Sequence, residues 1–393
     1  MGKRFNLIYI IVGLLVLLIF VFIFIKFSKY HYGYFKSVAN LEFNHPDADV
    51  IKLSNNQIII LGNDIKQIPS EIYNPVTNEV KTFTFKNNLF ISQRGIALKD
   101  NKILLINTCD SKLLKCNLNN FYDFKNNISI YDINLQKIVS NYTFKNFSNL
   151  IIEDYLCLED GNVFFILSSN PIKKKPEYYF LVYDVQKNST NILKKTSNLH
   201  RPKGVKISND EILIFQDNST VLKYNVKKQD FVPTKTKTSI YNCSYTKIGD
   251  KVLVLGTSGA LNNKNQYNQL YDINQDKITN IPQMHFDRTF ALLNSNGKTI
   301  YRTIPITSKQ VLIMGGRKHS KWGLGIRGID IKNAEIYDID KNAFIPIANS
   351  NYTHDSSELI KLDDNILIIG GTTNKIGGVE IYSVKEKGEK YEY

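Results

Sequence analysis

A short apolar run followed by a strand with a central tyrosine recurs seven times along this chain. The clearest copies read ILIIGG at 366–371 with EIYSV at 380–384, and VLIMGG at 311–316 with EIYDI at 335–339. The other apolar runs are IIILGN (58–63), ILLINT (103–108), FFILSS (164–169), ILIFQD (212–217) and VLVLGT (252–257). The runs start about 51 residues apart on average, a period typical of propeller blades and similar arrays.

The composition of each copy predicts strands. The apolar runs are short, β-rich and bounded by Asn, Asp, Gly or Lys, which favours buried strands over helices. The tyrosines at one shared position can pack between sheets while their hydroxyls find polar partners; they are Tyr73, Tyr131, Tyr183, Tyr224, Tyr271, Tyr337 and Tyr382. An outer strand is expected about seven residues after each tyrosine. Four strands per copy, repeated radially, predict an all-β propeller of seven blades.

The pattern resembles the kelch repeat over about residues 48–393. That resemblance rests on Gly315-Gly316 and Gly370-Gly371 at the ends of two apolar runs and on the seven tyrosines. The tryptophan that the family carries in its fourth strand is replaced throughout. The resemblance implies a β-propeller, whose last blade must be completed to close the ring. We expect the C-terminal residues 389–393 to form the outer strand of that blade, with 37–43 packed alongside.

The N-terminal region predicts a membrane anchor. Residues 5–25 contain 21 residues without a charge, about 31 Å as a helix, which matches a bilayer core. No small-residue cleavage site follows, so the segment is interpreted as a signal anchor rather than a cleaved signal. The expected organisation is a cytoplasmic tail (1–4), a transmembrane helix (5–25), a stalk (26–37) and an extracytoplasmic propeller (38–393).

Charge and cysteine content restrict the partners. The chain carries 50 basic and 36 acidic residues, a formal net charge of +14. This favours anionic lipid or an acidic glycan. No stacked aromatic platform accompanies the basic run 173–175, so nucleic acid is not expected. Cys109 and Cys116 could form a disulfide in the loop after the second apolar run.

Arginine is rare in this chain, and its positions are informative. Only seven of the 50 basic residues are arginine, and most fall in segments expected to meet on one face of the propeller. Arginine binds carboxylate or phosphate bidentately, so this face is a candidate anion-binding surface. The alternative is structural, with link arginines tying blade to blade through backbone carbonyls. The candidate ligand-binding residues are Arg94, Arg201, Arg288, Arg317, His319, Trp322, Arg327 and His354.

Two classes of function remain open. The leading hypothesis is a membrane-anchored interaction module that binds a protein or an acidic glycan, without a metal, cofactor or assigned catalytic residue. The alternative is a mutarotase or isomerase acting on an acidic sugar such as sialic acid. That alternative needs a base, an acid and an arginine, for which His285, His354, Glu358 and Arg288 are candidates. A copper radical oxidase would need a cysteine beside a channel tyrosine, and no cysteine pairs plausibly with one.

Overall fold

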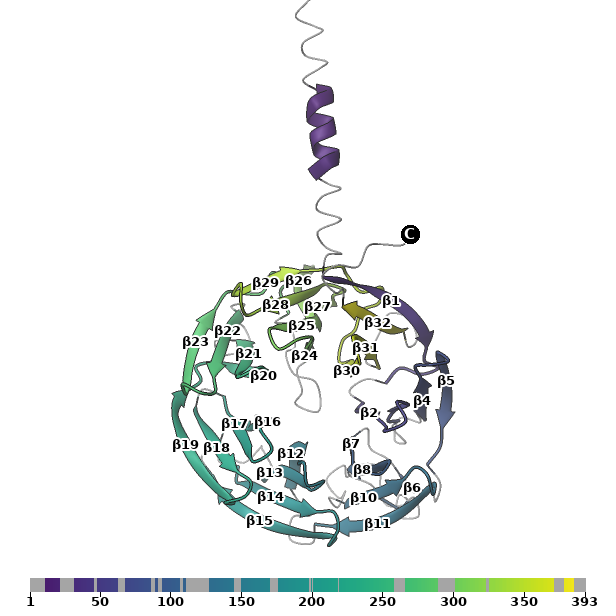
Figure 1. The fold of residues 1–393 in the computed structure, drawn as a ribbon, viewed down its shortest axis with the longest axis vertical. Helices are drawn as coiled ribbons and strands as arrows, with labels where there is room; N and C mark the ends of the chain where they lie inside the picture. Colours follow the sequence, from purple (N-terminus) through teal and green to yellow (C-terminus); the bar gives the residue numbers. More distant parts are fainter. Residues whose placement is uncertain are drawn as a thin grey trace, which may run out of the picture.

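In the residues that the structure describes, the chain forms a ring of seven four-stranded antiparallel sheets (Figure 1). The structure is a computed structural model. It describes residues 11–21, 32–45, 48–62, 68–85, 89–90, 94–106, 109–110, 127–144, 150–169, 176–197, 199, 201–217, 219–257, 266–288, 301–322, 325–370 and 378–384. The predicted seven-bladed propeller is therefore confirmed.

The blades follow the sequence repeat, and within each blade the strands run in order from the channel to the rim. Blade 1 is β2 (Val50–Lys52), β3 (Ile58–Ile60), β4 (Ser70–Asn74) and β5 (Glu79–Phe83). Blade 2 is β7 (Gly95–Ala97), β8 (Lys102–Ile106), β10 (Asn127–Asp132) and β11 (Lys137–Thr143). Blade 3 is β12 (Leu150–Cys157), β13 (Val163–Ser169), β14 (Tyr178–Asp184) and β15 (Ser189–Thr196). Blade 4 is β16 (Lys203–Lys206), β17 (Glu211–Phe215), β18 (Thr220–Asn225) and β19 (Asp230–Lys237).

The remaining blades include the one that closes the ring. Blade 5 is β20 (Tyr241–Ile248), β21 (Lys251–Thr257), β22 (Gln266–Asp272) and β23 (Lys277–Ile281). Blade 6 is β24 (Tyr301–Pro305), β25 (Gln310–Gly315), β28 (Ala334–Asp338) and β29 (Ala343–Pro346). Blade 7 is β30 (Glu358–Leu362), β31 (Asn365–Ile369), β32 (Gly378–Val384) and β1 (Gly33–Asn40). Two short ribbons lie outside the blades: β6 (Leu89–Phe90) with β9 (Cys109–Asp110), and β26 (Arg317–Trp322) with β27 (Gly325–Asp330).

Ring closure differs from the expectation. The outer strand of blade 7 is the N-terminal β1, which pairs antiparallel with β32 from Gly33↔Val384 to Asn40↔Gly378. The predicted closing residues 389–393 lie outside the described part of the chain. Phe35 packs on Tyr382 with ring centroids 4.9 Å apart, which fixes β1 against the blade. The propeller therefore begins before the predicted boundary at residue 38.

The predicted membrane anchor is corrected by the structure. Of residues 5–25, the structure describes 11–21, which form a helix. Among the described residues, no helix is long and apolar enough to cross a bilayer. The single-pass membrane location that depended on this anchor is therefore not supported.

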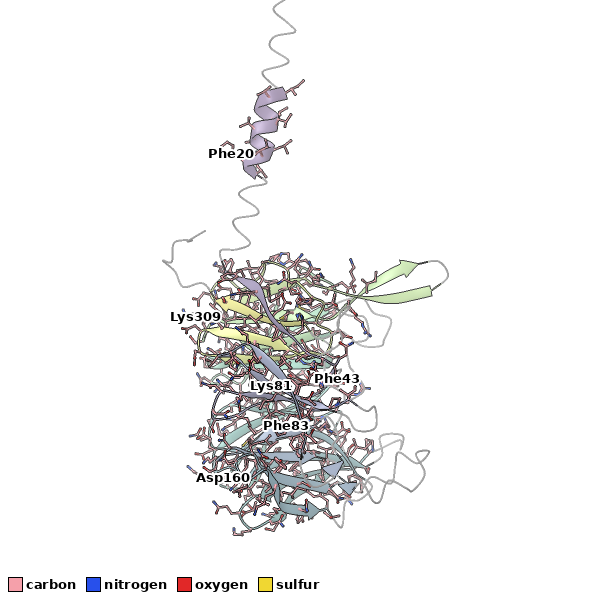
Figure 2. The ribbon with its side chains drawn as sticks, turned by 90° about the vertical axis from the view of Figure 1, so that its right-hand side faces the viewer. Phe20, Phe43, Lys81, Phe83, Asp160 and Lys309 are labelled. Atoms are coloured by element: carbon pink, nitrogen blue, oxygen red, sulfur yellow. The ribbon has the colours of Figure 1, made fainter. Side chains whose placement is uncertain are left out.

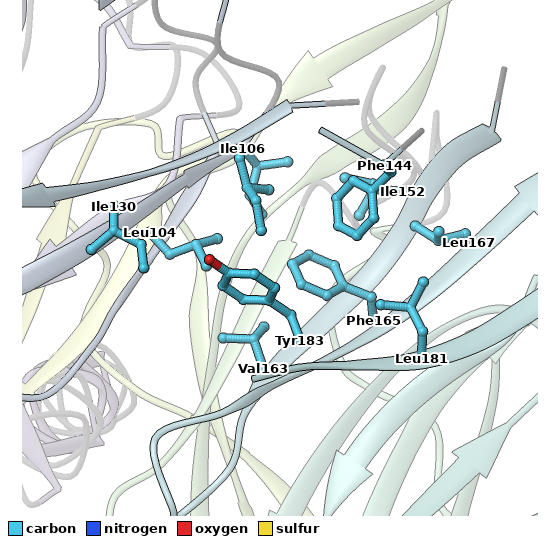
Figure 3. Packing of buried hydrophobic residues seen from close by; sticks show 11 residues of the cluster. Leu104, Ile106, Ile130, Phe144, Ile152, Val163, Phe165, Leu167, Leu181 and Tyr183 are labelled. Atoms are coloured by element: carbon cyan, nitrogen blue, oxygen red, sulfur yellow. The ribbon is translucent and has the colours of Figure 1, made fainter. Parts of the chain in front are cut away.

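The core lies between neighbouring blades, where the apolar runs of adjacent sheets face each other. Figure 3 shows one such layer, in which Leu104 and Ile106 of blade 2 meet Val163, Phe165 and Tyr183 of blade 3. All five side chains are fully buried. Burial on both faces explains why each second strand is a continuous apolar run instead of alternating with polar residues. The glycine pair Gly315-Gly316 ends one such run with φ of 71° and 95°, a conformation that glycine adopts without strain.

The repeat tyrosines are held by a hydrogen bond that recurs between blades. The hydroxyls of Tyr73, Tyr183 and Tyr337 each donate to the side-chain oxygen of the asparagine five residues later, at 2.7–3.0 Å. Tyr271 donates in the same way to Asp276 Oδ1 at 2.9 Å. The acceptors occupy the left-handed position of the turn between the third and fourth strands, with φ of 47–56°. Asn and Asp tolerate that conformation, so one residue both makes the turn and holds the ring.

This bond predicts different results for two otherwise similar tyrosines. Tyr271→Phe is expected to lower the free energy of unfolding by about 1–2 kcal/mol, because it removes a hydrogen bond to a carboxylate. Tyr224 occupies the same position in blade 4, but its hydroxyl has no hydrogen-bond partner, and burial raises its pKa to about 12. Tyr224→Phe is therefore expected to leave stability unchanged or slightly raised. Urea unfolding of both variants measures the difference, and equal losses would show that the hydroxyl bond is unimportant.

Candidate active site

The central channel is lined by the inner strands, whose register brings seven residues to one level. Each of these residues lies opposite the fourth residue of the apolar run that forms the second strand of its own blade. In blade order, the residues are Asp49, Arg94, Ile152, Lys203, Ser244, Arg302 and Glu358, which together form the inner ring. A β-bulge in β12 places Glu153 beside Ile152. The inner ring therefore alternates in charge over much of its circumference, which is unusual for a purely structural channel lining.

A cavity of about 270 Å³ lies against this ring. It is lined by residues of blades 7, 1, 2, 3 and 4: Glu358, Asp49, Val50, Arg94, Gly95, Glu153, Asp154, Tyr155 and Lys203. The lining is mostly charged, and both signs are present. Four carboxylates and two cations line it, which suits a small polar ligand rather than an apolar one.

Two of the lining carboxylates hold neighbouring blades together. Asp49 Oδ2 accepts the backbone N–H of Gly95 at 2.8 Å, and Asp154 Oδ2 accepts that of Gly204 at 2.8 Å. Asp49 also accepts a hydrogen bond from the Tyr155 hydroxyl. These carboxylates tie blade 1 to blade 2 and blade 3 to blade 4, so we assign them a structural role.

Arg94 and Lys203 supply the positive charge of the cavity. Arg94 Nη1 donates to the carbonyl of Ile152 at 2.7 Å, and its guanidinium lies 5.0 Å from the Tyr155 ring centroid. Arg94 Nε is buried and has no hydrogen-bond partner. Burial alone would lower the pKa of Arg94, but Tyr155, Asp49 and Asp154 raise it overall. Lys203 Nζ donates to the carbonyl of Glu153 at 2.7 Å. Both cations therefore reach the cavity from neighbouring blades, Arg94 from blade 2 and Lys203 from blade 4.

Glu358 is the carboxylate of the cavity that is best suited to proton transfer. It begins the inner strand of blade 7, and its side chain is 22% exposed. Its Oε1 lies 3.5 Å from Arg302 Nη2 of blade 6. Its position between the cavity and an arginine is that of a group which can exchange a proton with a bound ligand.

The candidate residues Arg288 and His354 are buried in contacts between a link and a blade. Arg288 is fully buried and donates to the carbonyls of Gly315 and Asn333, and its Nη2 lies 3.3 Å from Glu335 Oε1. His354 is also fully buried, with Nε2 2.5 Å from Glu380 Oε2. These contacts attach the segment that leads into blade 6 or blade 7 to that blade. Neither side chain belongs to the cavity lining.

A third pair of this kind was not predicted. His45, in the link into blade 1, lies 2.5 Å from Glu71, and both are fully buried. In all three pairs, the glutamate lies two residues before the repeat tyrosine. Each glutamate also accepts a hydrogen bond from a backbone N–H of the link, three residues before the histidine or arginine with which it pairs: Glu42 for Glu71, His285 for Glu335 and Asn351 for Glu380. The recurring EIY at 71–73, 335–337 and 380–382 was the available sequence signal.

The Glu380 carboxylate gives a testable pH dependence. Burial alone would raise its pKa, but His354 and the backbone N–H groups of Asn351 and Tyr352 lower it below the usual value. A lowered pKa stabilises the fold above the unfolded-state value of about 4.3, and this stabilisation is lost as the pH falls through the folded-state pKa. The stability difference between the wild type and Glu380→Gln should therefore be largest at neutral pH and shrink in acid. Urea unfolding between pH 7 and pH 3 measures it, and a constant difference would contradict the assignment.

The other candidates are dispersed. Arg201 is exposed in the link before β16, outside the cavity lining. Arg317 pairs with Asp330 and Asp355 at 2.6 Å each. His319, Trp322 and Arg327 lie on the β26–β27 hairpin, which projects from one face of the disc (Figure 2), and their side chains lie outside the described structure. Among the predicted ligand-binding residues whose side chains the structure describes, Arg94 is the one in the cavity lining.

Metal and disulfide chemistry can be stated only for the described residues. Within them, no group of three or more His, Cys, Asp or Glu side chains is arranged to hold a metal ion. Cys157 and Cys243 are free thiols. Cys109 lies in β9, but its side chain and the whole of Cys116 fall outside the described structure, so their predicted disulfide stays a prediction.

Comparison with known proteins gives the fold but no family. The sequence matches no protein-family model and no curated protein. A solved oligogalacturonate lyase in complex with manganese superposes with a TM-score of 0.52 at 8% identity, covering 90% of this chain and 97% of that chain. An oligogalacturonate lyase from Vibrio parahaemolyticus gives a TM-score of 0.55 at 9% identity, covering 90% and 98%. At such identities, the likeness establishes the propeller fold and leaves kelch identity unproven.

These neighbours also correct the leading functional hypothesis. Both are named oligogalacturonate lyases, enzymes that act on an acidic sugar oligomer, whereas the sequence was interpreted as a membrane-anchored interaction module. That hypothesis also depended on a membrane anchor, and no helix of the described residues is long and apolar enough to span a bilayer. The sugar-processing alternative agrees better with the neighbours.

Proposed function

We infer that this propeller is an enzyme that processes an acidic sugar at the channel cavity. The observation that carries the proposal is the presence of Arg94, Lys203 and Glu358 in one lining, two cations beside a carboxylate that can transfer a proton. Positive charge next to a sugar carboxylate stabilises the negative charge that develops when a neighbouring C–H proton is removed. Isomerisation and elimination both begin with that step.

The roles follow from the contacts. Arg94 contributes positive charge to the substrate carboxylate from blade 2, and Lys203 contributes a second charge from blade 4. Glu358 takes and returns the proton. Tyr155 holds the Arg94 guanidinium over its ring and is itself fixed by Asp49, so the cation is positioned before substrate arrives. The paired glycines and seven tyrosines further support a repeat of the kelch type, which we propose as the lineage of the fold.

Proton spectroscopy in D₂O tests the function. The full chain is incubated with galacturonate, glucuronate, their short oligomers and N-acetylneuraminate, and spectra are recorded with time. We expect one of these sugars to exchange a C–H proton for deuterium, to isomerise or to eliminate, at a rate that falls strongly in Arg94→Gln. Lys81→Gln, which changes an exposed lysine of blade 1, is the matched control and should react like the wild type. A folded protein that converts none of these sugars would overturn the proposal.

A further inference from the structure

Arg302 is a buried cation whose hydrogen-bonding capacity is mostly unused. It lies in β24 opposite Met314, on the inner ring beside Glu358, and its side chain is 10% exposed. Nη1 makes one long contact, 3.4 Å, to the carbonyl of Tyr301. Nε and Nη2 have no hydrogen-bond partner. The Nη2 to Glu358 separation of 3.5 Å is an ion pair but not a hydrogen bond.

A buried arginine with unused N–H donors lowers the stability of the fold unless another group accepts hydrogen bonds from it. Its guanidinium stays charged under all ordinary conditions, so burial cannot be relieved by loss of a proton. Buried donors without acceptors are rare in folded proteins, and they are more costly when charged. The two unused donors belong to the planar fork that fits both oxygens of a carboxylate or phosphate.

The next residue along β24, Thr303, makes polar contacts on the opposite face of the strand from Arg302. On the blade 5 side, Ser244 Oγ lies 3.0 Å and Thr246 Oγ1 2.5 Å from Thr303 Oγ1. Blades 7 and 1 separate Arg302 from Arg94 around the ring and bring Glu358 and Asp49 between the two arginines. A ligand group bound at Arg302 is therefore distinct from one bound at Arg94, and Glu358 lies between them.

We propose that Arg302 is a second oxyanion-binding site of the channel, and that the sugar taken by this protein carries two acidic groups. The step from a second site to a dianionic sugar rests on the proposed function. One acidic group binds at Arg94 and Lys203, and the other binds at Arg302. The bond or carbon that reacts then lies near Glu358. Carboxylate and phosphate share the required chemistry, so the second group is either of these.

Calorimetric titration of the full chain tests the proposal with three ligands. Galacturonate carries one carboxylate, digalacturonate carries two, and galacturonate 1-phosphate carries a carboxylate and a phosphate. We expect at least one of the dianionic sugars to bind about tenfold or more tightly than galacturonate. Arg302→Gln should abolish that preference, weakening the binding of the sugar with two acidic groups much more than that of galacturonate. Whichever dianionic sugar shows the preference identifies the second group.

Controls separate the possible failures. Lys309→Gln changes an exposed lysine of blade 6 and should keep the preference. Arg302→Lys retains the charge without the planar fork and should show a reduced preference if Arg302→Gln does not fold. Equal weakening of all ligands in Arg302→Gln, or no preference for either dianionic sugar, would overturn the second site. If no sugar binds, the proposed function fails. The second site is then tested by itself with inorganic phosphate, which should shift the nitrogen resonance of the Arg302 Nε–H group. No shift would overturn the second site.

Discussion

Replacing Arg288 with alanine is expected to lower the free energy of unfolding by about 3–5 kcal/mol. The guanidinium and the Glu335 carboxylate that it faces are both fully buried, and the same guanidinium donates to the carbonyls of Gly315 and Asn333. Alanine leaves Glu335 as an uncompensated charge in the interior and removes the donors from two backbone carbonyls. Urea unfolding followed by circular dichroism measures the loss.

A compensated variant distinguishes lost charge pairing from lost packing. Arg288→Met combined with Glu335→Leu replaces the pair with apolar side chains and should recover much of the stability, because buried ion pairs are often replaceable by well-packed apolar groups. A loss of less than about 1 kcal/mol in Arg288→Ala would contradict a structural role. It would return Arg288 to the candidate ligand-binding residues.

Replacing Glu358 with glutamine is expected to lower kcat by about 10²–10⁴-fold with the sugar that the D₂O experiment identifies. Glutamine keeps the size and the hydrogen-bonding shape but cannot take a proton. Because the proposed function assigns binding of the substrate carboxylate to Arg94 and Lys203, KM should change much less than kcat. Steady-state kinetics on the full chain separates the two quantities.

The matched control for this variant is Glu79→Gln, an exposed glutamate paired with Lys81 on the outer strand of blade 1. It makes the same chemical change far from the channel and should leave kcat unchanged. Melting curves of both variants check that the fold is intact. If Glu358→Gln retained full kcat, Glu358 would not be the proton-transfer group, and Glu153 would be the next carboxylate of the cavity to test.

The fold was largely predictable because its main signals are local. The run at 366–371 and the tyrosine strand at 380–384 predicted β31 and β32 from residues adjacent in sequence. The closing strand was not predictable in the same way. Both 37–43 and 389–393 have a composition that suits an outer strand. Which of them closes blade 7 depends on pairing between segments of the chain more than 300 residues apart in sequence.

The candidate site was much less predictable, for a related reason. Arginines stand out by their rarity, but rarity does not separate Arg94, which lines the cavity, from Arg288, which supports a blade. That distinction depends on burial and on partners from other strands. Lys203 looked ordinary in sequence and Glu358 was one of four candidates for the isomerase alternative; only the register of their inner strands brings the two to one level. The bulge in β12 that introduces Glu153 likewise has no local signal.

The closing strand has a consequence for how the chain is made. Of the strands in blade 7, β1 leaves the ribosome first and β32 last, so the first propeller strand to emerge waits for nearly the whole chain before it finds its partner. Until then, blade 7 has no outer strand and the ring has an open seam between blades 6 and 1. Nascent chains in which residue 378 has not yet left the ribosome should therefore be cut by protease within residues 33–40, and chains in which residue 384 has left it should be protected there.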